Sequence, residues 1–240
     1  MSELQSNTRQ ALLRVGTSTL TGVLNRRGLR SMFMQDVEPI RRDIPRMVGI
    51  AFTMRFIPSR EDKDGPGAPG RGQIQSQAME TCPPGHVLVV DSRGDARAAS
   101  AGDLYVGRLK ARGCAGIVTD GGLRDTDGIF KTGLPAYHRR ASSPPSPIAH
   151  HPCDLNLPIA CGGVAVYPGD IIVGDCDGVV VVPPDIVEAV AEEALATTLY
   201  EEFCEEQVAH GRALPGLFPI AGDEAKRDFE VWKKARSLSL

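Results

Sequence analysis

Hydrophobic positions in the first half of the chain predict strands that alternate with helices. Val48 to Ile57 alternates and carries bulky apolar side chains, which is typical of a strand that ends at Pro58. Val87 to Val90 and Ala115 to Thr119 are apolar runs of the buried-strand type, and Leu104 to Arg112 between them has helical spacing. A strand, a helix and a strand in so short a span require a parallel pair with a right-handed crossover. We therefore expect an α/β core.

Short β-rich runs follow in the second half of the chain. They cover Val164 to Val166, Ile171 to Val173 and Val179 to Val182, and turn-forming residues separate them at Pro168 to Asp170 and at Asp175 to Gly178. Short runs broken by such turns favour hairpins. The pattern predicts a hairpin-rich β layer beside the α/β core.

Helical spacing appears in three further segments. Thr17 to Leu24 and Ile74 to Thr81 predict short helices. Pro184 to His210 places its apolar residues on one face and is followed by Gly211, a helix-stopping residue, so the longest helix should lie near the C-terminus.

The length of the chain, 240 residues with 42% hydrophobic content, suffices for one sizeable core. We assign residues 1–211 to one domain. Residues 212–240 contain two prolines and the only tryptophan, and we expect them to form a C-terminal arm that packs on the same or a neighbouring subunit.

Charge and cysteine content narrow the class of partner. The 27 Lys and Arg residues nearly balance 30 Asp and Glu residues, which gives a net charge of −3 and no basic footprint for nucleic acid. The polar start, Met1 to Gln10, does not resemble a signal peptide, and no apolar run has the length of a membrane span. The six cysteines form no C-x-x-C pair, which favours reduced thiols. We expect a cytoplasmic protein that binds small solutes.

A glycine-rich segment, Ser59 to Gly72, contains a formal G-x-G-x-x-G match at Gly65, Gly67 and Gly70. A dinucleotide-binding turn needs a buried strand before it and a helix that opens within it, whereas this segment is polar and interrupted by prolines. The segment is better explained as a mobile surface loop.

Other motif-like segments do not match a known site. His150 to Asp154 has metal-ligand residue types, but its spacing fits no tetrahedral zinc site. Asp175 to Gly178 is faintly similar to a calcium loop, but its glycine comes too early and the required glutamate is missing, so a hairpin turn is favoured. The sequence has neither a G-x-S-x-G elbow nor a P-loop.

Two loops at the carboxyl ends of predicted strands carry candidate chemistry. After Val90 the chain leads into Gly102 and Asp103, and the helix that starts there offers free N–H groups at about Leu104 and Tyr105 to an anion such as a carboxylate.

After Thr119, two glycines turn the chain so that Arg124 and Asp125 can both face a cleft. Arg124 can hold a carboxylate or enolate oxygen, and Asp125 can bind a hard cation such as Mg²⁺. A structural interpretation stays open, in which Arg124 and Asp125 form a weak surface ion pair and Asp103 only caps a helix.

The residues around both loops resemble the RraA-like family, which includes 4-hydroxy-4-methyl-2-oxoglutarate/4-carboxy-4-hydroxy-2-oxoadipate aldolases. The resemblance is carried by Gly102–Lys110, Arg112-Gly113, Gly116–Val118, Asp120–Gly122 and Arg124-Asp125. It extends to Pro168–Asp170 and Asp175–Pro183, and covers about Thr17 to Gly211. It implies a swivelling β/β/α domain, assembled as a homotrimer or a dimer of trimers with sites between subunits.

The resemblance also implies roles for individual residues. Asp125 matches the carboxylate that holds Mg²⁺ or Mn²⁺, and Arg124 matches the arginine that binds substrate. The amides of Leu104 and Tyr105, after Gly102, match those that hold the pyruvyl carboxylate, and Asp103 matches the carboxylate that orients a water on the metal.

A glutamate from a neighbouring subunit's long helix also serves the family site. Glu201 or Glu202 is the nearest match for it. The polar residues that family aldolases contribute before the first βα unit find no match in Ser59 to Gly72.

The activity implied is that of a metal-dependent class II pyruvate aldolase, which cleaves a small 4-hydroxy-2-oxo acid to pyruvate and also decarboxylates oxaloacetate through the same enolate. Two alternatives stay open. Some family members are non-catalytic regulators that bind and inhibit a ribonuclease. A lyase for a sugar-derived 2-oxo acid would keep the chemistry but change the substrate.

Overall fold

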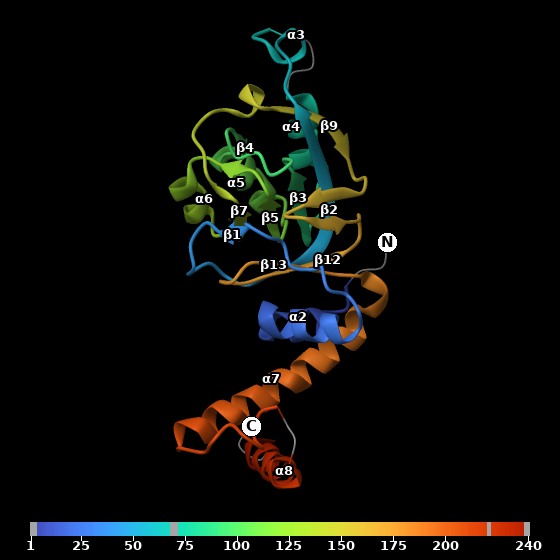
Figure 1. Cartoon of the computed structure of the whole chain (residues 1–240). Helices are drawn as coiled ribbons and strands as arrows, with labels where there is room; N and C mark the ends of the chain where they lie inside the picture. The colour runs from blue at the N-terminus through green and yellow to red at the C-terminus, as the bar shows by residue number, and fades with distance from the viewer. Residues whose placement is uncertain (1–3, 68–71, 220–221, 238–240) are drawn as a thin grey trace.

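The structure is a computed structural model that describes residues 4–67, 72–219 and 222–237 (Figure 1). Its α-helices are α1 (Ser6–Arg14), α2 (Thr17–Arg26), α3 (Glu61–Asp64), α4 (Gln73–Thr81), α5 (Asp103–Ala111), α6 (Thr126–Thr132), α7 (Val187–Ala209) and α8 (Asp223–Ser237), and its 3₁₀ turns are η1 (Ser146–Ile148) and η2 (Pro184–Ile186). Its strands are β1 (Glu38–Pro39), β2 (Met47–Pro58), β3 (His86–Asp91), β4 (Ala99–Ala101), β5 (Gly116–Thr119), β6 (Gly122–Leu123), β7 (Ala136–His138), β8 (Arg140–Ala141), β9 (His150–Leu155), β10 (Ile159–Cys161), β11 (Val164–Val166), β12 (Ile171–Gly174) and β13 (Val179–Val182).

The largest sheet has the strand order β1-β7-β5-β3-β2-β12-β13, and β9 also pairs with β2. Strands β2, β3, β5 and β7 are mutually parallel, and β3, α5 and β5 form the βαβ unit that the sequence predicts. Strands β12 and β13 form an antiparallel hairpin at the other end of this sheet. The expected α/β core with an added hairpin layer is therefore confirmed.

The sheet closes almost completely into a barrel. The chain before β1 runs beside the last strand, where Met34 N donates to Val179 O at 2.9 Å and Val181 N donates to Met32 O at 2.9 Å. It then pairs as β1 with β7, so one short segment links both edges of the sheet. Closure removes exposed strand edges. The interior is filled by the apolar residues Met34, Val37, Met47, Ala51, Val87, Val89, Val118, Tyr137, Ile159, Cys161, Val164, Val166, Ile172, Val179 and Val181.

Helices cover the outside of the barrel in two groups. Helices α4, α5 and α6 pack over β3 and β5, and α1, α2 and α7 pack over β12 and β13 (Figure 1). Both faces of the hairpin are buried, because Ile172 and Val181 point into the barrel while Val173 and Val180 point to the helices. This explains why β13 is an uninterrupted run of valines.

Helix α7 leads away from the barrel, and α8 folds back against its far half (Figure 1). A separate small core joins them, in which Phe203 and Leu217 are buried and Trp232 packs edge-to-face with Phe203 and stacks on Phe229. The arm therefore packs on its own chain in this structure, and the division of the chain at residue 211 stays a prediction.

Some expectations were wrong or incomplete. Within the expected loop Ser59 to Gly72, residues 61–64 form α3, and Asp64 is buried beside His151 at 2.7 Å, while residues 68–71, including Gly70 of the glycine match, lie outside the described residues. The turn Pro168–Asp170 is not a hairpin, because β11 pairs with β10 whereas β12 pairs with β2 and β13. Strand β9 was not predicted, although it pairs antiparallel with β2.

Over the part of the chain that the structure covers, no helix combines the length and apolar character that a membrane crossing requires. All six cysteines are unpaired thiols, and four of them are buried, namely Cys82, Cys114, Cys161 and Cys204. The remaining two lie nearer the surface.

Candidate active site

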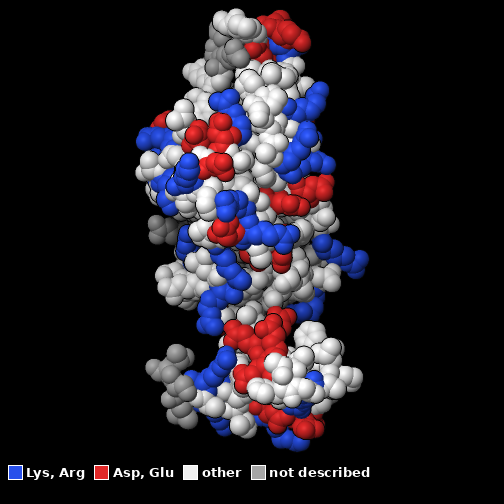
Figure 2. Space-filling model, turned by 90° about the vertical axis from the view of Figure 1, so that its left-hand side faces the viewer, with Lys and Arg blue, Asp and Glu red and all other residues white. Residues whose placement is uncertain are grey.

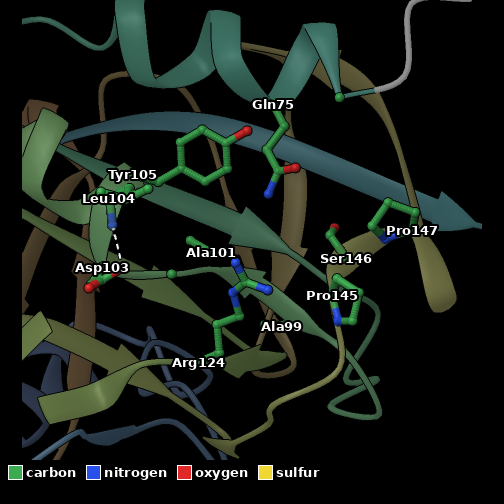
Figure 3. A pocket seen from close by; sticks show the side chains of 12 residues that line it. Gln75, Ala99, Ala101, Asp103, Leu104, Tyr105, Arg124, Pro145, Ser146 and Pro147 are labelled. Atoms are coloured by element: carbon green, nitrogen blue, oxygen red, sulfur yellow. Dashed lines mark hydrogen bonds between the residues drawn. The ribbon is translucent and has the colours of Figure 1, made fainter. Parts of the chain in front are cut away.

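A cavity of about 470 Å³ lies at the carboxyl ends of the small parallel sheet β4-β6-β8. The chain after each strand of this sheet contributes to the lining: the start of α5 follows β4, Arg124 follows β6, and the Pro145–Pro147 segment comes shortly after β8. Helix α4 closes the remaining side (Figure 3). Ligands collect at the carboxyl ends of parallel strands, so the fold places this cavity where a small-molecule site is expected.

The N-terminus of α5 forms one side of the cavity. The first helical backbone bond runs from Val106 N to Gly102 O at 3.1 Å, so the amides of residues 103–105 precede the helical hydrogen-bond ladder. Leu104 N donates to Asp103 Oδ1 at 2.8 Å (Figure 3). These amides and the helix dipole make this side attractive to an anion.

Arg124 and Asp125 follow β6 and approach the same helix start. Arg124 N donates to Ala101 O at 3.1 Å, and Arg124 Nε lies 3.3 Å from Asp125 Oδ2. Asp125 has a left-handed backbone with φ of 55°. A Cβ on Gly102 would lie 3.0 Å from both Arg124 Nε and Asp125 Oδ2, so the absence of a side chain at Gly102 permits this close approach.

The Asp120-Gly121-Gly122 segment fixes the loop that carries Arg124. The buried Asp120 carboxylate accepts hydrogen bonds from Ser92 N at 2.7 Å and Gly94 N at 2.9 Å, and burial raises the pKa of this carboxyl group. A Cβ on Gly121 would lie 2.5 Å from Ser92 Cβ, and one on Gly122 would lie 2.5 Å from a side-chain atom of Ser142. Only glycine fits at these two positions. Through its two hydrogen bonds, Asp120 joins the loop after β5 to the loop after β3.

A buried hydroxyl cluster lies behind the cavity. Ser92 Oγ, Ser100 Oγ and Thr119 Oγ1 lie within 2.7 to 3.0 Å of one another, and Thr119 Oγ1 also accepts from Gly121 N at 3.0 Å. The cluster ties β4 to the end of β5. It holds both loops of the candidate site in a fixed relation.

The structure brings most of the predicted site residues together. Gly102, Asp103, Leu104, Tyr105 and Arg124 all line the cavity. Asp125 is not among the lining residues, but it lies next to Arg124, and 49% of its side chain is exposed. Their chemical roles stay predictions.

Two polar lining residues were not predicted. Gln75 of α4 is 6% exposed and donates from Nε2 to Ser100 O at 2.6 Å, and Ser146 lies in η1 with its Oγ buried and without a hydrogen-bond partner among the described residues. Gly72, the last residue of the expected surface loop, also lines the cavity. Gln75 shares the buried side of α4 with Ala78 and Met79, and a polar residue at such a core position was a signal that the sequence contained.

The glutamates predicted from the long helix are not near this cavity within one chain. Glu201 accepts from Thr19 Oγ1 at 2.9 Å, and Glu202 pairs with Arg236 at 3.2 Å and Arg14 at 3.9 Å. They lie on α7, where Figure 2 shows acidic side chains gathered over the lower half of the molecule. They could serve the cavity only of another copy of the chain.

The other metal-like clusters have structural partners. Asp175, Cys176 and Asp177 lie close enough together to hold an ion, but both carboxylate oxygens of Asp175 accept from Thr17, at 2.8 Å each. The imidazole of His151 pairs with Asp64. The hydrogen bonds of Asp175 and His151 are therefore explained by a structural role.

The comparisons with known proteins identify the family. A family model described as RraA-like, Aldolase/RraA, matches residues 17–181. The chain belongs to the RraA-like family.

Among solved structures of this fold, Streptomyces coelicolor RraAS2 is 30% identical with a TM-score of 0.75, and the similarity covers 85% of this chain and 98% of that one. RraAS2 is described as an unusual member of the RNase ES inhibitor RraA protein family. An uncharacterized protein from Pseudomonas syringae pv. tomato shares the fold with a TM-score of 0.77 at 22% identity, over 90% of this chain and 99% of that one.

Among curated proteins, one from Halalkalibacterium halodurans, provisionally named a 4-hydroxy-4-methyl-2-oxoglutarate aldolase, is 41% identical over 121 residues. The match covers 49% of this chain and 56% of that protein, so the chain spans about half the length of this relative. The family model and the name of this relative support membership of the aldolase/RraA family, without specifying a substrate.

Proposed function

We propose that this protein is a divalent-metal-dependent pyruvate aldolase that cleaves a small 4-hydroxy-2-oxo acid and also decarboxylates oxaloacetate. The observation that carries the proposal is the meeting of Arg124 and the N-terminus of α5 at one cavity, with Asp125 Oδ2 3.3 Å from Arg124 Nε. A site that only stabilised the fold would not need a guanidinium group and a helix N-terminus to meet at a cavity beside a half-exposed carboxylate.

The residues present fit a hard cation. Asp125 offers carboxylate oxygens, its side chain is half exposed, and Gly102 has no side chain to fill the adjacent space. Mg²⁺ and Mn²⁺ accept a single protein carboxylate when water and substrate oxygens complete their coordination. Asp125 would hold the ion. The bound ion would act as a Lewis acid toward the oxygen of the 2-oxo group.

Substrate binding would use the two sides of the cavity that meet at Gly102. The carboxylate of the pyruvyl unit would accept from the amides of Leu104 and Tyr105, and Asp103 Oδ1 would then release the Leu104 amide it now occupies. Arg124 would face the 2-oxo group with its planar donors.

Cleavage would break the bond between C3 and C4 of the substrate. The 4-hydroxyl group loses its proton and becomes the carbonyl of the leaving aldehyde or ketone, and the bonding electrons form the pyruvate enolate. Arg124 stabilises the enolate oxygen, and a proton returned to C3 completes pyruvate. Asp103, half-buried at the helix start, is placed to pass these protons through water.

We further propose that the active unit is a homotrimer or a dimer of trimers. In such an assembly Glu201 or Glu202 of the partner subunit would reach the cavity of its neighbour. The projection of α7 away from its own barrel supports this arrangement.

The first test is pyruvate release from oxaloacetate, from 4-hydroxy-4-methyl-2-oxoglutarate and from 4,5-dihydroxy-2-oxopentanoate, each with Mg²⁺, with Mn²⁺ or with EDTA. We expect metal-dependent release by the wild type, and at least a 100-fold loss of kcat/KM in Asp125→Ala because the metal ligand is removed. Asp127→Ala is the matched control, since Asp127 is an exposed carboxylate two residues away on α6.

Equal activity of Asp125→Ala and Asp127→Ala would show that Asp125 is not the metal ligand. The absence of release above the metal-only background from all three substrates would refute the aldolase itself.

The similarity to RraAS2 favours a second function, inhibition of a ribonuclease by direct binding. It would be tested by adding the protein to RNase ES and measuring RNA cleavage. Inhibition that survives Asp125→Ala and EDTA would support the regulator, because a protein-binding surface does not need the cation.

A further inference from the structure

The cavity extends well beyond the positions proposed for the pyruvyl group. Its volume of about 470 Å³ exceeds what a pyruvyl unit fills, and it lies within the range of about 300–1,000 Å³ typical of small-molecule sites. In Figure 3, Asp103 and Leu104 lie on one side and Pro145, Ser146 and Pro147 lie on the opposite side. The part of the substrate beyond C3 must lie toward this second side.

Gln75 supplies one hydrogen-bonding group, held in a fixed orientation, in that space. It is 6% exposed, it points from α4 into the cavity, and its Nε2 is held by Ser100 O at 2.6 Å. This bond fixes the orientation of the amide, and Oε1 accepts no hydrogen bond from the described residues. An oriented buried amide of this kind selects ligands that can hydrogen-bond to it.

Ser146 supplies a second group. Its Oγ is buried and has no hydrogen-bond partner within the described part of the chain, although it lines the cavity. The prolines on both sides restrict the backbone that carries it. Leaving a hydroxyl group buried and unpaired costs free energy, so its retention at a cavity wall points to a ligand that satisfies it.

The described lining contains a single cationic side chain. Among the described lining residues only Asp103 and Arg124 are charged. In Figure 3 the Arg124 side chain lies between the two sides of the cavity, and in the function proposed above its guanidinium group faces the 2-oxo group. Gln75, Ser146, Pro145 and Pro147 are neutral. A second carboxylate beside them would lose its hydration without gaining a cationic partner of its own.

We infer that Gln75 and Ser146 form a specificity site for the distal part of the substrate, and that this part is neutral and hydroxylated. The inference rests on the proposed aldolase function and names its substrate class: monocarboxylic 4-hydroxy-2-oxo acids with a polyol-like end. Cleavage of such a substrate yields pyruvate and a hydroxyaldehyde, with the 4-hydroxyl proton leaving and one proton returning to C3.

The test compares two substrates of equal carbon skeleton. 4,5-Dihydroxy-2-oxopentanoate carries a hydroxymethyl group where 4-hydroxy-2-oxoglutarate carries a carboxylate. We expect the metal-loaded wild-type protein to prefer the dihydroxy acid by about tenfold or more in kcat/KM, because only its distal group can satisfy Gln75 and Ser146 without burying a charge.

Ser146→Ala and Gln75→Leu are the informative variants. Each should lower this preference about tenfold, the effect of one lost hydrogen bond to the substrate. Ser146 Oγ has no partner to lose, so Ser146→Ala keeps the test valid if Gln75→Leu, which strips Ser100 O of its donor, fails to fold. The controls are Ser143→Ala and Gln77→Leu, whose side chains are exposed and lie outside the lining.

The outcomes separate the inference from the function on which it rests. Preference for the dicarboxylate, or an unchanged substrate ratio in Ser146→Ala, overturns the specificity site while the aldolase stands. An equal loss of kcat/KM on both substrates in Ser146→Ala would mean that Ser146 has only a structural role, and this result also overturns the specificity site. No metal-dependent pyruvate from either acid overturns the aldolase, and the specificity site with it.

Discussion

Gly102 is the residue at which the two halves of the candidate site meet. A methyl group there would lie 3.0 Å from the side-chain atoms of Arg124 and Asp125, tighter than ordinary van der Waals contact. The backbone of Gly102 is extended, with φ of −127°, so an alanine would suffer no backbone strain. We expect Gly102→Ala to fold but to displace Arg124 and Asp125, and to lower kcat/KM for pyruvate release at least tenfold.

Gly107→Ala provides the matched control on the same helix. A Cβ at Gly107 meets nothing within 4 Å, and the substitution should raise the free energy of unfolding by up to about 1 kcal/mol. Pyruvate release by both variants and their urea unfolding would be measured. Wild-type activity in Gly102→Ala would contradict the close approach described for this site.

The residues that could be predicted were those with strong local reasons. Gly102 and Asp103 stand at a helix start, and Arg124 follows a double-glycine turn, so local sequence patterns predict both loops. Ser146 gave no comparable signal, because its importance lies in a missing partner. That absence depends on which segments surround it, and only tertiary structure determines those.

At the level of elements, Asp175 joins a hairpin turn to the start of α2. Its two carboxylate oxygens accept from Thr17 N and Thr17 Oγ1, at 2.8 Å each, in a buried setting. The helix is thus capped by a residue far away in sequence, while its own preceding residue, Gly16, has no side chain to do so. Asp175→Ala should lower the free energy of unfolding by about 1–3 kcal/mol, measured by urea denaturation.

Asp177→Ala tests whether that loss is specific to the cap. Asp177 is exposed in the same turn, so its replacement should change stability by less than about 0.5 kcal/mol. If the two variants were equally stable, Asp175 would not be the cap.

Elements with long or repeated patterns could be predicted, and short ones could not. The sequence predicts β3, α5 and β5 because apolar runs and helical spacing alternate there. Strand β9 combines histidines, a proline and polar residues, and exists because β2 offers it an edge with which to pair. Helix α6 has seven residues and starts directly after Asp125, whose left-handed backbone no local pattern indicates.

At the scale of the whole molecule, buried histidines make the stability of the barrel sensitive to acid. Burial lowers the pKa of His138 to about 4, and burial also lowers the pKa of His150. The folded-state pKa lies below the unfolded value of about 6.5, so this contribution to stability is complete above pH 6.5 and is lost as the pH falls toward 4. For His138 the loss amounts to about 3 kcal/mol.

The measurement is urea unfolding of the wild type and of His138→Leu at intervals from pH 7.5 to 4. The variant should lose about 3 kcal/mol less than the wild type across this range. His210→Leu, which replaces an exposed histidine, should follow the wild type. Parallel curves for His138→Leu and the wild type would show that His138 does not resist protonation in the folded state.

The packing of α1 and α2 against elements near the other end of the chain has a consequence for how the protein is made. Helices α1 and α2 are synthesised before the strands, yet their apolar faces are buried against β13 and α7, which are synthesised some 160 residues later. At a typical rate of about 10 residues per second, these helices wait on the order of ten seconds without their partners. During that interval their apolar faces are available to chaperones and to other nascent chains, so translation speed and chaperone supply should govern the yield of folded protein.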